Sequence, residues 1–236
     1  IISAIGLLLT TGLAQAIVVD GDIADWIGPP NGSASDWTPS DSSVQFWEED
    51  QSASYLNPGY GGQDYDAEAI YVKKGDTSIY IAIVTGLDPA ISGNNAWPAG
   101  DIALDFGFPH DAGKPANEIL DRSFEFGLVT LDDAFGVSAA PGTLFSVDPK
   151  NGWNYGLWDA PDQQGKSDGA EFRLAHPTTI KTGTALAPAV GESGAELVYK
   201  ELTYDKLGAF DGRHYLIEAS IPWDLLTLPG RNLKTE

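Results

Sequence analysis

Carboxylate side chains gather in short clusters along this chain, and such clusters provide the chemistry that a hard cation such as calcium needs. Calcium takes roughly six to eight oxygen ligands from carboxylates, backbone carbonyls and water. Asp64, Asp66 and Glu68 occupy alternate positions leading into a strand-like segment, so they would project on one side of it. Asp101 and Asp105 alternate in the same way on a second segment. We therefore predict a calcium site formed by these five residues.

Two further acidic groups, at residues 20–25 and 48–50, offer the same chemistry. No acidic group in the chain matches the calcium-binding loop of the EF-hand. For any single group the alternative is a set of solvated carboxylates at turns and strand edges.

Aromatic residues in polar, glycine-rich sequence suggest a second kind of chemistry, the stacking of a sugar ring on a flat side chain. Trp153, Asn154, Tyr155 and Trp158 are the densest such group, and Trp97 lies in similar sequence. A sugar stacks its apolar face on an aromatic ring while amides bond its hydroxyls. We therefore predict that these five residues bind a ligand. The alternative is that these rings are buried at the ends of the sandwich. We assign Trp26 and Trp223, which lie in or after strand-like apolar sequence, to the core.

Motifs for covalent catalysis are missing from the sequence. The chain has no cysteine, which excludes disulfides, thiolate nucleophiles and Cys-bound metal centres. Each of the three histidines, His110, His176 and His214, lies in turn-like sequence or at the start of a strand. No G-x-S-x-G, H-E-x-x-H or phosphate-binding glycine motif occurs. We predict a protein that is not an enzyme, with a glycoside hydrolase using two carboxylates as the least favoured alternative.

The net charge of the chain limits the classes of molecule that it can bind. Asp and Glu number 34 against 13 Lys and Arg, for a net charge of −21. Such a field repels nucleic acid and anionic membrane surfaces, so we predict that neither is a direct partner. It is compatible with hard cations and neutral polar ligands, although solubility alone would also account for it.

Alternating and β-branched segments separated by Gly, Pro, Asn and Asp predict an all-β chain. The clearest hairpin pairs residues 68–72 with 78–84, and Gly75 in its turn is free to adopt positive φ. Residues 78–84 are apolar on both faces, which favours a central strand. We expect an antiparallel β-sandwich of jelly-roll or immunoglobulin-like type with long loops. The other predicted strands are 101–106, 124–131, 169–175, 195–204 and 215–221, with a loop at 177–194.

The start of the chain resembles a secretion signal. Residues 1–13 are mostly apolar and are followed by Ala14-Gln15-Ala16, a small-residue cleavage pattern. We predict a signal peptide over residues 1–16 with its beginning clipped, and a single domain over 17–236 whose last strands lie beyond the end. The protein would be secreted, extracellular or at the cell surface. Any membrane attachment would need an anchor that this chain does not contain.

Several segments resemble known secreted proteins. Residues 18–26 and the later residues 217–223 resemble β-sandwiches of the family 9 carbohydrate-binding-module and DOMON-like class. Residues 55–69 and 100–107 resemble bacterial exported proteins that carry a C-terminal PEP-CTERM sorting signal. The resemblance implies a non-catalytic extracellular module, often containing calcium, that associates with polysaccharide or biofilm matrix. Some DOMON domains hold haem through Met and His, but this chain has no Met, so we predict no haem.

Three functions therefore remain open from the sequence. The first is a secreted module that binds polysaccharide or another glycan and is stabilised by calcium. The second is a structural surface or matrix protein without a small ligand. The third is a glycoside hydrolase.

Overall fold

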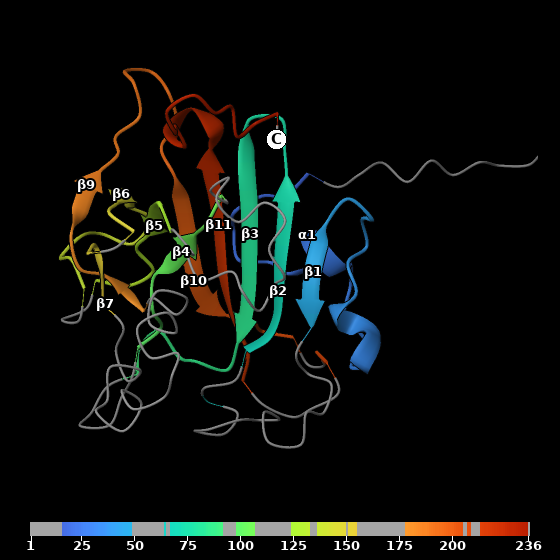
Figure 1. Ribbon diagram of the computed structural model, residues 1–236. Helices are drawn as coiled ribbons and strands as arrows, with labels where there is room; N and C mark the ends of the chain where they lie inside the picture. Colours follow the sequence, from blue (N-terminus) through green and yellow to red (C-terminus); the bar gives the residue numbers. More distant parts are fainter. Residues whose placement is uncertain are drawn as a thin grey trace, which may run out of the picture.

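The computed structural model describes residues 16–48, 64, 67–91, 98–106, 124–132, 136–149, 151–154, 178–204, 207–208 and 213–235. Almost all regular structure within this part is β, in three antiparallel sheets (Figure 1). The helical segments described there are one short α-helix and two 3-10 turns. Among these residues, no helix has the length and apolar character needed to cross a membrane. The predicted all-β class is confirmed.

The larger sheet has five strands in the order β1-β2-β3-β11-β10, which lie side by side in Figure 1. β3 pairs with β11 over its whole length, from Ser78 opposite Pro222 to Thr85 opposite Tyr215. Because β2 pairs on its other side, β3 is the central strand, as its two apolar faces predict. The predicted hairpin corresponds to β2 and β3. The bounds are β1 Gln45–Glu48, β2 Ala67–Lys74, β3 Ser78–Thr85, β10 Glu196–Glu201 and β11 Tyr215–Pro222.

A second sheet has four strands in the order β4-β5-β6-β9, and β7 pairs with β8 in a small third sheet. The strands of both sheets are short, which explains why the sequence predicted few of them. Their bounds are β4 Ile102–Leu104, β5 Phe126–Leu128, β6 Leu144–Val147, β7 Trp153–Asn154, β8 Thr179–Ile180 and β9 Gly183–Ala185.

The main core lies between the five-stranded and four-stranded sheets, which makes the fold a sandwich. Ile81, Ile217 and Ile221 of the larger sheet belong to one buried cluster with Leu104 and Phe126 of the smaller sheet. Burial of such side chains is worth roughly 1.5–3 kcal/mol each. The short 3-10 turn η6 (Trp223–Leu225) closes this core at the end of β11, and Trp223 is buried there as predicted.

The opposite face of the larger sheet is covered over part of its length by the N-terminal segment, residues 17–44. This segment contains α1 (Ala24–Ile27) and the 3-10 turn η1 (Ala34–Trp37). Trp26 and Trp37 are fully buried against Tyr71 and Leu216 of the sheet. The core position predicted for Trp26 is therefore confirmed.

Three local expectations are wrong. Gly75 does not have a positive φ; glycine is needed there because a Cβ would lie 2.7 Å from the Tyr80 ring. The strand predicted over residues 124–131 is shorter than expected: β5 covers only Phe126–Leu128, and Phe124 packs against the cluster that contains Trp153. The stretch expected to be a loop at 177–194 contributes the short strands β8 and β9, while the predicted strand 169–175 lies outside the described residues.

Candidate functional site

Three neighbouring strands place a row of side chains on the outer face of the larger sheet. Tyr80 of β3 lies opposite Ser220 of β11, which lies opposite Glu196 of β10. Ser78 lies opposite Pro222 one row further along. Because side chains alternate along a strand, these residues face away from the main core, on the same side as the N-terminal segment.

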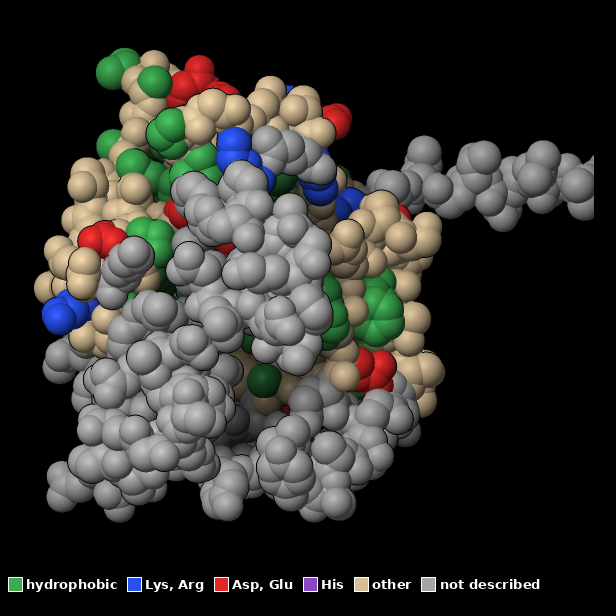
Figure 2. Space-filling view, in the orientation of Figure 1, with side chains coloured by type: hydrophobic (Ala, Val, Ile, Leu, Met, Phe, Trp, Pro, Cys, Tyr) green, Lys and Arg blue, Asp and Glu red, His purple; other side chains and the backbone are tan. Residues whose placement is uncertain are grey.

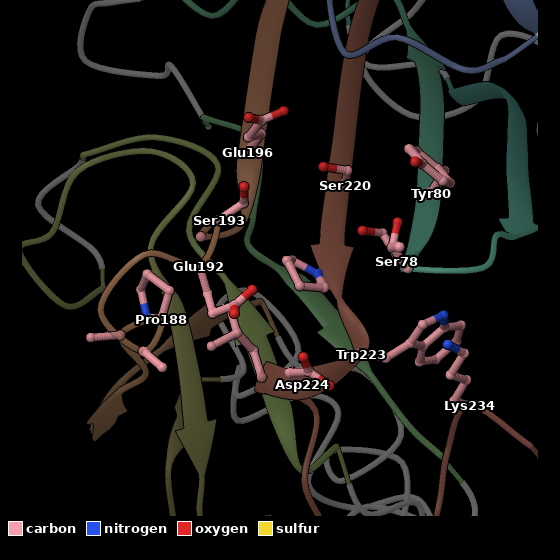
Figure 3. A pocket seen from close by; sticks show the side chains of 16 residues that line it. Ser78, Tyr80, Pro188, Glu192, Ser193, Glu196, Ser220, Trp223, Asp224 and Lys234 are labelled. Carbon is pink, nitrogen blue, oxygen red and sulfur yellow. The ribbon is translucent and has the colours of Figure 1, made fainter.

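These side chains line a cavity of about 880 Å³ at the end of the face where β11 stops. Ligand pockets commonly enclose about 300–1,000 Å³. Figure 3 shows residues of three strands, of the segment before β10 and of the C-terminal segment surrounding one hollow. The hydroxyl-bearing residues of the lining are Thr77, Ser78, Tyr80, Ser193 and Ser220, and its charged residues are Glu192, Glu196, Asp224 and Lys234.

Two of the hydroxyls are buried without a protein partner. Ser78 is 8% exposed and Ser220 is 9% exposed, and neither side chain makes a hydrogen bond within the described residues. A buried hydroxyl without a partner costs about 1–3 kcal/mol, so such groups bond water or a ligand. Since both line the cavity, the hydrogen-bonding capacity they carry is directed into it.

Aromatic residues form one wall of the pocket. The Tyr80 ring lies against Gly75, where a Cβ would come within 2.7 Å. The Trp223 indole N–H donates to the Gly75 carbonyl at 2.9 Å, and its backbone N–H donates to the Thr77 carbonyl at 3.0 Å. The Lys74 ammonium lies 5.7 Å from the centre of the Trp223 ring. These contacts hold the β2–β3 turn against the end of β11 and so fix this wall.

The charges around the pocket are unbalanced. Its carboxylates, Glu192, Glu196 and Asp224, outnumber its one ammonium group, that of Lys234. Within the described residues none of the four side chains makes an ion pair or hydrogen bond. The pocket therefore presents hydroxyls, aromatic surface and uncompensated negative charge.

A buried carboxylate anchors the N-terminal segment on this face of the larger sheet. Glu218 is completely buried; its Oε2 accepts the backbone N–H groups of Asp20 at 3.1 Å and Gly21 at 2.7 Å, and its Oε1 accepts the Trp26 indole N–H at 2.8 Å. Burial raises the pKa of the Glu218 carboxyl, and these three donors offset part of the rise. Residues 18–26 and 217–223 thus meet at Glu218.

Asp36 anchors the same segment further along. Its carboxylate accepts backbone N–H groups of the preceding turn at 2.7–3.2 Å and that of Gly208 at 3.2 Å. Burial by itself raises the pKa of Asp36, but the N–H donors outweigh it and the pKa lies below its usual value. The donors of the preceding turn are Asn31, Gly32 and Ser33.

The residues predicted to bind calcium occupy different surroundings. Glu68 is 1% exposed, with its Oε1 3.3 Å from His214 Nε2. Asp101 accepts the N–H groups of Thr130 at 3.2 Å and Ile180 at 2.7 Å. Asp64 and Asp105 are exposed, and Asp66 lies outside the described residues. In the part of the chain that the structure describes, no three His, Cys, Asp or Glu side chains are grouped to hold a metal ion. The calcium site stays a prediction.

The predicted aromatic ligand site is only partly described. Trp153 is 3% exposed, and its indole N–H donates to the Phe124 carbonyl at 3.0 Å. The Asn154 amide donates to Thr179 Oγ1 at 3.1 Å. Trp97, Tyr155 and Trp158 lie outside the described residues. Trp153 therefore packs in a core, as the alternative for these rings proposed, while the ligand role of the group stays a prediction.

Sequence reasoning did not single out the pocket residues, because they lie in segments interpreted only as strands and loops. One signal was available: Ser220, like Glu218, is a polar residue in a strand whose other residues are mostly apolar. A polar residue within a central strand indicates either a buried hydrogen bond or a cavity.

Known proteins give no independent guide to this site. No model of a protein family matches the chain, and neither a curated protein nor a solved structure does.

Proposed function

We propose that this protein is a secreted, non-catalytic binding module that takes a carbohydrate in the outer-face pocket. The observation that carries the proposal is the pair of buried hydroxyls of Ser78 and Ser220 beside the Tyr80 ring, which no described residue bonds. Sugars present both hydroxyls and apolar C–H surface, so they match a lining of this kind. The net charge of −21 disfavours anionic ligands.

The carboxylates favour binding over glycoside hydrolysis. A hydrolase needs a proton donor with a raised pKa facing the scissile bond. Burial raises the pKa of the Glu218 carboxyl, but both of its oxygens are already bonded to N–H donors of the N-terminal segment. Glu218 is not among the residues that line the pocket. It serves as an anchor of the fold.

A structural matrix protein without a small ligand is the second candidate. Burial of Trp153 favours it, because rings that fill the core do not stack on sugars. Acidic side chains also lie scattered over the described part of the surface in Figure 2, and charged surfaces of this kind keep a protein in solution. A structural matrix protein would have no use for the outer-face pocket, so this alternative does not explain it.

A glycan array probed with the folded protein tests the proposal, with two tryptophan variants of exposed serines for comparison. Ser193→Trp places a bulky ring at the rim of the pocket, while Ser42→Trp places the same ring before β1, away from it. We expect a glycan signal that falls at least about tenfold in Ser193→Trp, which is about 1.4 kcal/mol of binding, and is unchanged in Ser42→Trp.

Two results would count against the proposal. Absence of any glycan signal from folded protein would favour the structural alternative. Equal binding by both variants would move the ligand to another surface.

A further inference from the structure

The uncompensated charge of the pocket goes beyond what a neutral sugar requires. Figure 3 shows Glu192 and Glu196 on the β10 side of the hollow, Asp224 at the end of β11, and Lys234 on the opposite side. None of these carboxylates has an ion-pair partner among the described residues. A ligand bearing positive charge on the β10 side would therefore meet carboxylates that no described residue pairs with.

A metal ion does not account for these acids. A calcium site needs its oxygens converging on one point at about 2.3–2.6 Å. The three carboxylates line one pocket, yet they do not form a group able to hold a metal within the described chain. Carboxylates spread around a cavity suit an organic cation whose charged groups are themselves spread out.

The buried hydroxyls identify the rest of the ligand. Ser78 and Ser220 are more than nine-tenths buried, bond no side chain or backbone group of the described residues and line the same cavity. Each hydroxyl can both donate and accept a hydrogen bond, which suits ligand hydroxyls. Tyr80 adds an aromatic ring beside them. A polyhydroxylated ligand with amino groups meets all of these features, whereas a simple polyamine meets only the carboxylates.

We infer that the pocket binds amino sugars with free, protonated amines, in short oligosaccharides. This inference rests on the proposed function, because it specifies the class of carbohydrate that the pocket takes. Glu192 and Glu196 pair with the ammonium groups, while Ser78 and Ser220 bond the sugar hydroxyls.

Three β-1,4-linked hexasaccharides that differ only at carbon 2 test the inference by calorimetric titration. Glucosamine hexamer carries amines, N-acetylglucosamine hexamer carries neutral amides, and cellohexaose carries hydroxyls. In mildly acidic buffer of about 20 mM ionic strength, we expect the glucosamine hexamer to bind about tenfold more tightly than either neutral hexamer. Raising the salt to about 500 mM should remove most of that difference.

Two Glu→Gln variants on β10 test whether the preference for the glucosamine hexamer comes from the pocket carboxylates. Glu196→Gln removes a pocket carboxylate from β10, and Glu201→Gln removes an exposed carboxylate from the same strand outside the pocket. We expect Glu196→Gln to weaken glucosamine hexamer binding about threefold to fivefold and to leave the neutral hexamers unchanged. Glu201→Gln should behave as the wild type. Thermal melts of all three proteins show whether they are folded.

The outcomes separate the inference from the proposed function. Equal affinity for all three hexamers, lost in Ser193→Trp, would overturn the amino-sugar inference and leave carbohydrate binding intact. Hexalysine binding as tightly as the glucosamine hexamer would also overturn it, since charge alone would then suffice. No binding of any hexamer would count against both.

Discussion

Replacing Glu218 with Gln tests how the N-terminal segment is held on the sheet. Gln has nearly the same shape as Glu but only one acceptor oxygen, and its amide nitrogen is a donor. The Glu218 carboxylate accepts three N–H groups, from Asp20, Gly21 and Trp26. The least costly orientation keeps the oxygen toward the two backbone groups and turns the amide nitrogen toward the Trp26 indole. That orientation leaves the completely buried indole N–H without an acceptor.

The expected loss follows from the orphaned indole N–H, which also faces the donor N–H group of the Gln amide. A buried N–H without a partner costs about 1–3 kcal/mol. Removal of a charge that burial disfavours returns part of this cost, because burial raises the Glu218 pKa. We therefore expect Glu218→Gln to lower the free energy of unfolding by about 1–2 kcal/mol. A Trp26→Phe protein has no indole N–H that could be left without an acceptor. In that background the loss of unfolding free energy caused by Glu218→Gln should therefore be smaller by about 1 kcal/mol.

Urea denaturation of the four proteins in this double-mutant cycle measures the coupling directly. If the cost of Glu218→Gln agrees within about 0.3 kcal/mol in the two backgrounds, the Glu218–Trp26 hydrogen bond does not contribute as described. Trp26→Phe alone loses packing as well as the N–H, but that loss is common to both arms and cancels.

The same variant has a defined effect on pH dependence. The folded-state pKa of Glu218 is raised, so between about 4.3, the ordinary glutamate value, and that raised pKa the folded protein binds more protons than the unfolded chain. The Glu218 contribution to stability is therefore fully present below the ordinary value and is lost as the pH rises through the folded pKa. Glu218→Gln should flatten this decline, and an unchanged stability–pH profile would contradict the assignment.

Two further predictions concern glycine geometry and metal binding. Gly208 has a φ of 69°, and a Cβ there would lie 2.5 Å from the Trp37 ring, so Gly208→Ala should destabilise by about 2–4 kcal/mol in urea denaturation. Gly191 has a φ of 91° with open space around it, so Gly191→Ala should cost only about 1 kcal/mol; equal costs would show that the Trp37 contact is unimportant. The calcium prediction expects a thermal midpoint that rises with added calcium and falls with EGTA, and a midpoint that neither reagent moves would remove it.

The parts of the fold that the sequence predicted are those with long, continuous patterns. β2, β3 and β11 each run over eight residues rich in β-branched and aromatic side chains, so local pattern was sufficient. β6 and β7 are too short to establish a period of two, and only pairing with β5 or β8 makes them strands. The strand predicted over residues 124–131 was too long, because its pattern was extended beyond the three residues that pair with β4 and β6.

The candidate site was harder to predict, because it depends on register between distant segments. Tyr80, Ser220 and Glu196 become neighbours only through the pairing of β3 with β11 and of β11 with β10. No local motif encodes that row. Residue type alone drew attention instead to Trp153, whose ring fills a core. The type of an aromatic residue does not reveal which face of the fold it occupies.

The most direct test of carbohydrate binding at the outer face is a map of backbone amide chemical shifts during titration with the hexasaccharide that binds best. We expect the largest changes at the amides of Ser78, Tyr80, Ser193, Glu196 and Ser220. Changes confined to Trp153, Asn154 and their chain neighbours would place the ligand at the aromatic group instead and would contradict the outer-face pocket.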